Sequence, residues 1–131
     1  MLSLLMRGAA WALIILICVL SLVPPVQRPT TVSHGLEHLG IFFMTGVAFG
    51  LGYRRRHFAQ AMALIAFAGA IEIAQFLSPG RHPRLSDFLI DAIGACSGIV
   101  VASIVNKFIG VVHSCRDWGR RPSEANRGED R

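Results

Sequence analysis

The stretch FLIDAIGACSGIVVASIVNKFIGVV, residues 88–112, decides the fold of this chain because its apolar character continues for so long. A helix needs about 20 predominantly apolar residues to cross the hydrocarbon core of a bilayer. This run offers that length with Asp91 and Lys107 as its only charged residues. It therefore predicts a membrane-spanning helix.

Three more apolar runs lie upstream, at about residues 9–23, 36–53 and 58–77, and the first of them can begin as early as Leu2. Pro24 and Pro25 end the first run, since proline cannot continue a helix interior. No small-residue cleavage site follows this run, so we interpret it as an uncleaved span and not as a signal peptide. We predict an all-α fold, a bundle of four transmembrane helices in residues 1–112, followed by a polar cytoplasmic tail in residues 113–131 that has too little apolar surface to fold.

The composition agrees with a membrane protein. Of the 131 residues, 53% are hydrophobic and 16% are charged, and the mean hydropathy is +0.51, whereas soluble domains carry roughly 25% charged residues. The net charge is +5, but the basic residues flank the apolar runs, so membrane lipids with anionic headgroups are the predicted partner and nucleic acid is not. The three cysteines show neither a disulfide framework nor metal-ligand spacing.

The distribution of Lys and Arg predicts the orientation. Of the thirteen Lys and Arg, ten lie on the side of the termini and of residues 54–56, and three (Arg28, Arg81 and Arg84) lie on the other side. Because cytoplasmic segments carry the excess of positive charge, both termini and the arginines 54–56 are predicted to be cytoplasmic. The loops 24–37 and 78–87 then face outward, and we interpret the three arginines as a topology anchor.

This orientation brings the polar side chains at membrane level to the outer end of the bundle. Glu37 and His38 open the second span, the third span closes with Glu72 and Gln75, and the fourth opens with Asp87 and Asp91. Polar groups in lipid are expensive and are functional candidates by default. The predicted ligand-binding residues are His38, Glu72, Gln75, Arg81, Arg84, Asp87 and Asp91.

The spacing of these residues sharpens the hypothesis. Glu72 and Gln75 share one helix face, as do Asp87 and Asp91, and Glu72 and Asp91 are expected to meet at one depth on antiparallel neighbours. Two such carboxylates are unfavourable if both are charged, so one holds a proton, or Arg81 or His38 supplies the balancing charge. Two alternatives stay open, because Asp87 fits an ordinary helix cap and Glu72 fits a buried structural ion pair.

Two short patterns have simpler explanations. HGLEH at residues 34–38 fits the H-x-x-E-H zinc-protease pattern, with Glu72 as a conceivable third ligand. The pattern is short and Gly35 weakens the helix, so we predict no metal and no cofactor. The glycine pairs Gly46/Gly50 and Gly94/Gly98 are spaced as in helices that approach closely in lipid.

The same residues resemble the VanZ-like family of bacterial membrane proteins. The stretch EIAQFLSPGRHPRLSDFLIDAIG at residues 72–94 resembles that family's E-x-x-Q-x-x-x-x-x-R pattern, followed by D-x-x-x-N-x-x-G, and SLVP at residues 21–24 resembles the close of its first span. His38 with Phe42 and Phe43 is similar to its D-K-x-x-H segment. The chain departs from the family at His34 and Gly35, which replace Asp and Lys, and at Asp91, which replaces Asn. The resemblance covers roughly residues 11–105.

The resemblance implies four spans in a bacterial cytoplasmic membrane and a link to low-level resistance to the glycopeptide teicoplanin, but no molecular activity. Our leading hypothesis is an outward-facing pocket that binds an envelope component, such as a lipid-linked or anionic headgroup, with Arg81 and Arg84 on the anion. One alternative is an enzyme acting on a lipid phosphate or glycosyl bond, with acid and base groups drawn from His38, Glu72, Asp87 and Asp91. Another is a proton-coupled transporter with Glu72 as the relay, which in so small a bundle favours a homo-oligomer.

The orientation is tested by reporter fusions. Fusions at Arg55 and at the C-terminus should report a cytoplasmic location, and fusions near Gln27 and His82 an external one, because ten basic residues flank one side. An external C-terminus would contradict both the number of spans and the outward-facing pocket.

Overall fold

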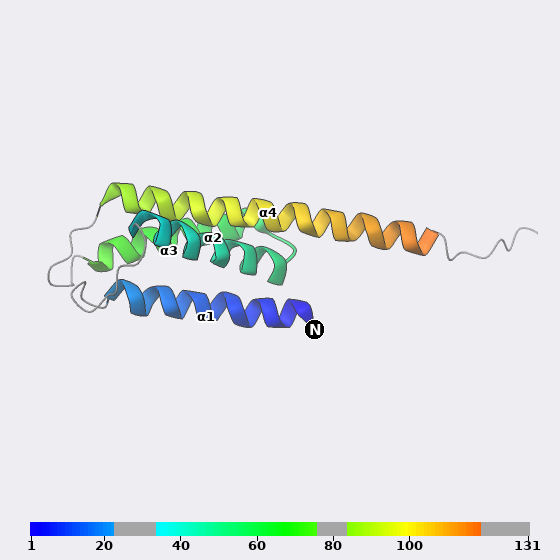
Figure 1. Cartoon of the computed structure of the whole chain (residues 1–131), viewed down its shortest axis with the longest axis horizontal. Coiled ribbons are helices and arrows are strands. Elements are labelled where there is room, and N and C mark those ends of the chain that lie inside the picture. Colours follow the sequence, from blue (N-terminus) through cyan, green and yellow to red (C-terminus); the bar gives the residue numbers. More distant parts are fainter. Residues whose placement is uncertain (23–33, 76–83, 119–131) are drawn as a thin grey trace, which may run out of the picture.

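A computed structural model describes residues 1–22, 34–75 and 84–118 of the chain (Figure 1). In these residues the chain forms four helices and no strand: α1 (Leu2–Leu22), α2 (His34–Gly52), α3 (His57–Gln75) and α4 (Leu85–Trp118). The predicted all-α fold with four spans is confirmed. Each helix lies close to the predicted apolar run, because these runs lack internal proline and hold their charges near the ends.

All four helices are long and apolar enough to cross a membrane. The first three have 21, 19 and 19 residues, close to the ~20 that a span needs. In α4 the candidate span is Leu85–Val112, and the helix continues through Trp118. The structure thus differs from the prediction at residues 113–118, which are helical and not part of an unfolded tail.

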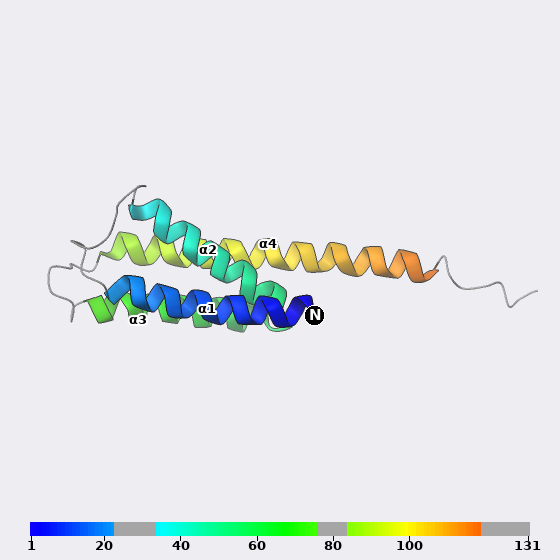
Figure 2. The same ribbon diagram turned by 60° about the horizontal axis from the view of Figure 1, so that its bottom comes forward.

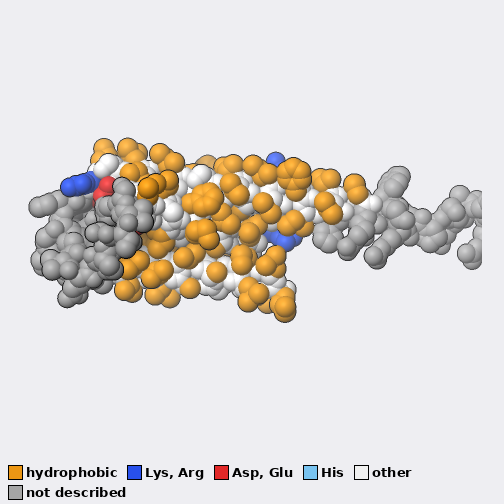
Figure 3. Space-filling model, viewed as in Figure 1, with side chains coloured by type: hydrophobic (Ala, Val, Ile, Leu, Met, Phe, Trp, Pro, Cys, Tyr) orange, Lys and Arg blue, Asp and Glu red, His pale blue; other side chains and the backbone are white. Residues whose placement is uncertain are grey.

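The outer surface of the bundle is apolar, as lipid requires. Large hydrophobic side chains such as Ile15, Phe58 and Phe108 are more than half exposed. Figure 3 shows hydrophobic side chains over the whole middle of the visible face, with the few charged ones near the ends. The chain is therefore a multi-pass membrane protein whose helices contact lipid.

The bundle has two chemically different ends. At one end α1 and α3 finish and α2 and α4 begin (Figure 1). We call it the polar end, because His38, Glu72 and Asp91 lie there. At the opposite end α1 begins, and the short turn of residues 53–56 joins α2 to α3. We call it the basic end, because Arg7 and the arginines 54–56 lie there.

The most extensive helix–helix interface joins α2 to α4, and Figure 2 shows α2 crossing α4 obliquely. Glycines make this close approach possible. A Cβ atom added at Gly46 would collide with the carbonyl oxygen of Ala95, and one added at Gly98 with that of Phe43. At Gly94 an added Cβ would lie 2.7 Å from the Leu39 carbonyl oxygen. The backbones are therefore in direct contact, as the glycine spacing predicts.

The remaining helices pack around this pair. α1 lies against α2, and α3 lies against α4, with smaller contacts to α1 and α2. The buried core joins all four helices through apolar side chains, most of them aliphatic. Its members are Ile17, Phe42, Leu64, Ala68, Ile71, Ala95 and Ile99.

The glycine contact predicts a selective loss of stability. Gly98→Ala should lower the free energy of unfolding by about 1–3 kcal/mol, because the new methyl group can be accommodated only if the α2 and α4 backbones separate. Gly40→Ala is the matched control on α2, since a Cβ there meets nothing within 4 Å. Thermal denaturation of the purified proteins in one detergent compares them. Equal melting temperatures for the two variants would contradict the backbone contact.

Candidate functional site

Buried polar side chains gather at the polar end, and all four helices contribute to them. α1 supplies a serine hydroxyl, and α3 supplies a carboxyl group and a side-chain amide. α2 and α4 supply a histidine and an aspartate that pair with each other. Each is less than a tenth exposed. They are Ser21, His38, Glu72, Gln75 and Asp91. The sequence predicted this gathering for α2, α3 and α4, and Ser21 adds α1 to the cluster.

His38 and Asp91 form a closed pair between α2 and α4. The His38 Nδ1 atom lies 3.0 Å from Oδ1 and 3.3 Å from Oδ2 of Asp91, and the Asp91 side chain is fully buried. An ionised carboxylate can only accept, so Nδ1 then carries the hydrogen and donates it. A buried carboxylate needs such a partner, because isolated charges are very costly away from water.

The glycine contact sets the geometry of this pair. His38 directly precedes Leu39, whose carbonyl oxygen lies against Gly94, and Asp91 precedes Gly94 by one helical turn. The close approach at Gly94 therefore brings the Asp91 carboxylate within hydrogen-bonding distance of the imidazole. A larger residue at position 94 would separate the two helices at this point.

Glu72 on α3 is only partly satisfied. Its side chain is 7% exposed, and Oε2 accepts the backbone N–H of Arg84 at 3.2 Å. Arg84 caps α4, since its carbonyl oxygen accepts the N–H groups of Asp87 and Phe88, and the positive end of that helix favours a carboxylate nearby. The other oxygen, Oε1, is buried and has no hydrogen-bond partner in the described part of the chain.

A hollow of about 350 Å³ adjoins this carboxyl group between α3 and α4. Its lining combines Glu72 and Arg84 with the apolar residues Ile73, Leu85 and Phe88. Ile73 is 69% exposed and Leu85 74% exposed, so the hollow opens on the surface that faces lipid.

The other predicted site residues lie around this core. Gln75 is buried at the end of α3, and Asp87 is half-buried in the first turn of α4, where it accepts a hydrogen bond from the Ser86 hydroxyl at 3.2 Å. Arg84 is exposed. Arg81 lies outside the described residues, so its predicted contact with the carboxyl groups stays a prediction.

The partners differ from the expected arrangement in one respect. We expected Glu72 and Asp91 to meet at one depth on neighbouring helices. The hydrogen bonds that the structure describes instead pair each carboxyl group with another donor: Asp91 accepts from His38, and Glu72 accepts from the backbone N–H of Arg84. The reason is that α4 packs more extensively on α2 than on α3.

A second hollow at this end was not predicted. It measures about 390 Å³ between α1 and α2, and Ser21, Glu37 and His38 give it a polar lining. The SLVP pattern at the end of α1 was the sequence feature that could have placed Ser21 there. Among the described residues no three His, Cys, Asp or Glu side chains gather as metal ligands, and the side chain of His34 from HGLEH lies outside them.

The fold and the site together define a multi-pass membrane protein with a buried polar cluster at one end. Residues 10–106 match the family model described as VanZ/LLP1. The match spans well over half of the chain, so this protein belongs to the VanZ/LLP1 family, as its resemblance to VanZ-like proteins predicted. No curated protein matches significantly, and no solved structure does.

The closed pair predicts coupled effects on stability. Asp91→Leu should cost roughly 3–5 kcal/mol, because it leaves His38 buried without its acceptor, and His38→Leu/Asp91→Leu should recover much of that loss. Asp91→Asn, which keeps a carbonyl acceptor and the volume, should stay near the parent. Melting temperatures and membrane yields of these variants give the coupling energy. Additive losses in the double variant would show that the pair does not act as a unit.

Proposed function

We propose that this VanZ/LLP1 family protein binds the headgroup of a cell-envelope lipid at its polar end, on the outer side of the bacterial cytoplasmic membrane. The observation that carries the proposal is the buried Oε1 atom of Glu72, which lacks a partner among the described residues. The large majority of buried polar atoms in proteins are hydrogen-bonded, so a buried polar atom without a partner needs an explanation. A ligand that donates a hydrogen bond to Oε1 supplies one.

The lining of the hollow defines the chemistry of that ligand. Oε1 of Glu72 accepts from a hydroxyl or an amide N–H. Arg84, exposed at the rim, binds an anion such as a phosphate, and Arg81 in the preceding loop is proposed to assist. The apolar residues Ile73, Leu85 and Phe88 suit a lipid chain. Together they fit a lipid-linked phosphate whose neighbouring group carries hydroxyls or amides.

The distribution of charge supports the proposed orientation. The basic end holds Arg7 and the arginines 54–56, and cytoplasmic segments carry the excess of Lys and Arg. Both termini are then cytoplasmic, and the polar end faces outward. Protection against teicoplanin is the cellular consequence that we propose for holding such an envelope-lipid intermediate. Binding of teicoplanin to the purified protein in the absence of lipid would instead indicate a direct contact with the glycopeptide.

One observation favours a second candidate function, a membrane enzyme acting on a lipid phosphate or glycosyl bond. His38 lines the hollow between α1 and α2 while Asp91 fixes its ring, and a carboxylate that orients an imidazole is a common part of acid–base catalysis. Glu37 lines the same hollow. Conversion of a bound lipid to a new product would favour this function over binding alone.

The binding proposal is tested by the lipids that remain with the purified full-length protein. Glu72→Gln should keep the melting temperature within a few degrees, because Gln retains the volume and the acceptor for Arg84 N–H, while the co-purified envelope lipid is lost from mass spectra. Arg84→Gln and Arg81→Ala should weaken retention in the same way. Glu37→Gln is the matched control, since it removes a carboxylate from the same end but lines the other hollow.

The structural alternative gives a different pattern. If Glu72 and Arg81 form only a buried ion pair, each single variant should lose roughly 3–5 kcal/mol, and Glu72→Gln/Arg81→Ala should regain much of it. Unstable single variants with a rescued double variant would remove these residues from the proposed site. Retention of the lipid by all variants would also contradict it.

A further inference from the structure

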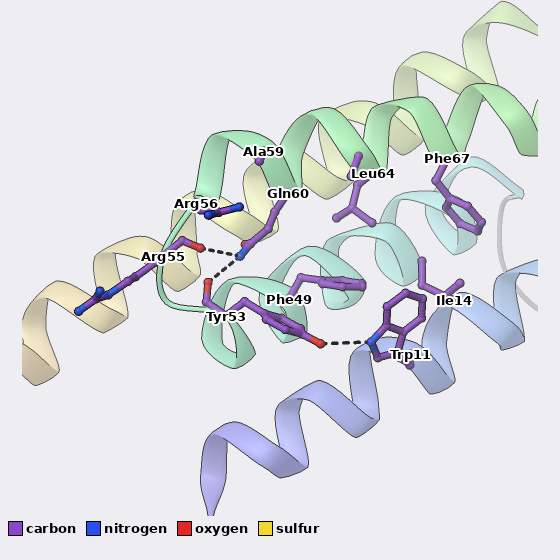
Figure 4. Close-up of a pocket in the computed structure, with 11 residues that line it drawn as sticks. Trp11, Ile14, Phe49, Tyr53, Arg55, Arg56, Ala59, Gln60, Leu64 and Phe67 are labelled. Atoms are coloured by element: carbon purple, nitrogen blue, oxygen red, sulfur yellow. Dashed lines mark hydrogen bonds between the residues drawn. The ribbon is translucent and has the colours of Figure 1, made fainter.

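Two hollows meet at the basic end, far from the polar cluster, and they differ in chemistry. The first, about 500 Å³, lies between α1, α2 and α3 (Figure 4). Its walls are mainly apolar and aromatic. They include Trp11, Phe49, Tyr53, Ala63, Leu64 and Phe67. We call it the aromatic groove.

The aromatic walls are fixed by their own contacts. The Trp11 and Phe49 rings pack edge to face with centroids 5.8 Å apart, and the Phe49 and Tyr53 rings stack at 5.9 Å. The Trp11 indole N–H donates to the Tyr53 hydroxyl at 3.2 Å (Figure 4). Because this polar group is satisfied within the wall, the aromatic side of the groove presents apolar surface to its contents.

The second hollow, about 640 Å³, is basic. Arg7 and the arginines 54–56 line it, and it shares Tyr53, Arg55 and Arg56 with the aromatic groove. Neither hollow has an Asp or Glu in its described lining. The apolar groove and the positively charged hollow are thus adjacent, an arrangement of shape and charge that suits an anionic amphiphile.

The arginines belong to a well-defined turn. Arg56 adopts a left-handed conformation, with φ of 76°, and the Gln60 side-chain amide donates to the carbonyl oxygens of Tyr53 at 2.6 Å and Arg55 at 3.4 Å (Figure 4). Arg7 donates from Nε to the Gly52 carbonyl oxygen at 2.9 Å and lies 4.6 Å above the Tyr53 ring. These contacts hold the mouth of the groove in one shape, whereas a topology anchor needs only positive charge.

We propose that the aromatic groove holds an acyl chain of an anionic glycerophospholipid, with its phosphate at Arg55 and Arg56. The groove lies at membrane depth, where acyl chains surround the protein, and the uncompensated arginines select the negative headgroup. This site is separate from the envelope-lipid site, since it uses other residues at the opposite end of the bundle. The proposed ligand is an abundant membrane phospholipid from the leaflet that surrounds the basic end of the bundle.

Fluorescence quenching of Trp11 by brominated lipids tests the proposal. The full-length protein has two tryptophans, so Trp118→Phe leaves Trp11 as the only tryptophan, which is excited selectively at long wavelength. This parent is reconstituted into phosphatidylcholine vesicles with a minor fraction of either brominated phosphatidylglycerol or brominated phosphatidylcholine. Brominated phosphatidylglycerol should quench Trp11 with several-fold higher apparent affinity, and added salt should reduce the difference because it screens exposed charges.

Matched variants distinguish a specific lipid-binding site from a general electrostatic attraction between the basic protein and anionic lipid. Arg55→Gln or Arg56→Gln should abolish most of the preference, while Lys107→Gln, which removes an equal charge outside both hollows, should keep it. Ala63→Leu should fill the groove and weaken quenching by phosphatidylglycerol, whereas Ala66→Leu, on α3 but outside the groove, should not. Equal quenching by the two lipids, or equal losses in Arg55→Gln and Lys107→Gln, would overturn the proposal.

Discussion

The backbone contact between α2 and α4 is the constraint on which the rest of the structure depends. In lipid the hydrophobic effect does not drive helices together, so association relies on close packing and hydrogen bonds. Gly46 and Gly98 allow this packing, because a Cβ at either position would collide with a carbonyl oxygen of the other helix. Once this register is set, Gly94 lies against Leu39 and the adjacent His38 meets Asp91. One steric contact therefore determines both the most extensive interface and the pairing of His38 with Asp91.

The two buried carboxyl groups at the polar end have different roles because they are satisfied to different degrees. Asp91 is fully buried and bonded to His38 through both oxygens, so a ligand would have to break an existing pair to reach it. Glu72 uses one oxygen for the Arg84 backbone and leaves the other without a described partner beside a hollow. The His38–Asp91 pair links α2 to α4, whereas the carboxyl group of Glu72 has one oxygen that can accept a hydrogen bond from a ligand. Glu72, not Asp91, is for this reason the centre of the proposed site.

The sequence predicted the four spans and the gathering of polar residues at one end, because both follow from hydropathy and from the positions of charged residues along the chain. It did not predict the partners. The short connection between the third and fourth spans favoured a meeting of Glu72 with Asp91, but α4 packs mainly on α2. The glycine pairs at 46/50 and 94/98 were visible in the sequence and, matched to each other, would have indicated the α2–α4 interface.

The aromatic groove could not have been predicted in this way, because its walls come from three helices and the rotation of each helix decides which side chains meet. Trp11, Phe49 and Phe67 are scattered among many apolar residues in the sequence, and only the packed bundle brings them together around one hollow. The arginines 54–56 were easy to recognise, but the sequence alone gives no reason to assign them more than the role of a topology anchor. The lipid-binding role proposed for Arg55 and Arg56 rests on the shape of the turn, which the Gln60 hydrogen bonds hold.

Both proposed lipid sites lie along α3, and the unequal packing of the helices explains why. α2 and α4 are locked together by glycines, while α3 makes a moderate contact with α4 and small ones with α1 and α2. A helix that is packed on few sides leaves hollows beside it, and α3 lines one near Glu72 and the other near Gln60. In lipid such hollows are filled by acyl chains, since an empty apolar cavity forfeits dispersion contacts. The tight pair thus acts as the scaffold, and α3 provides a wall of the lipid-facing hollow at each end of the bundle.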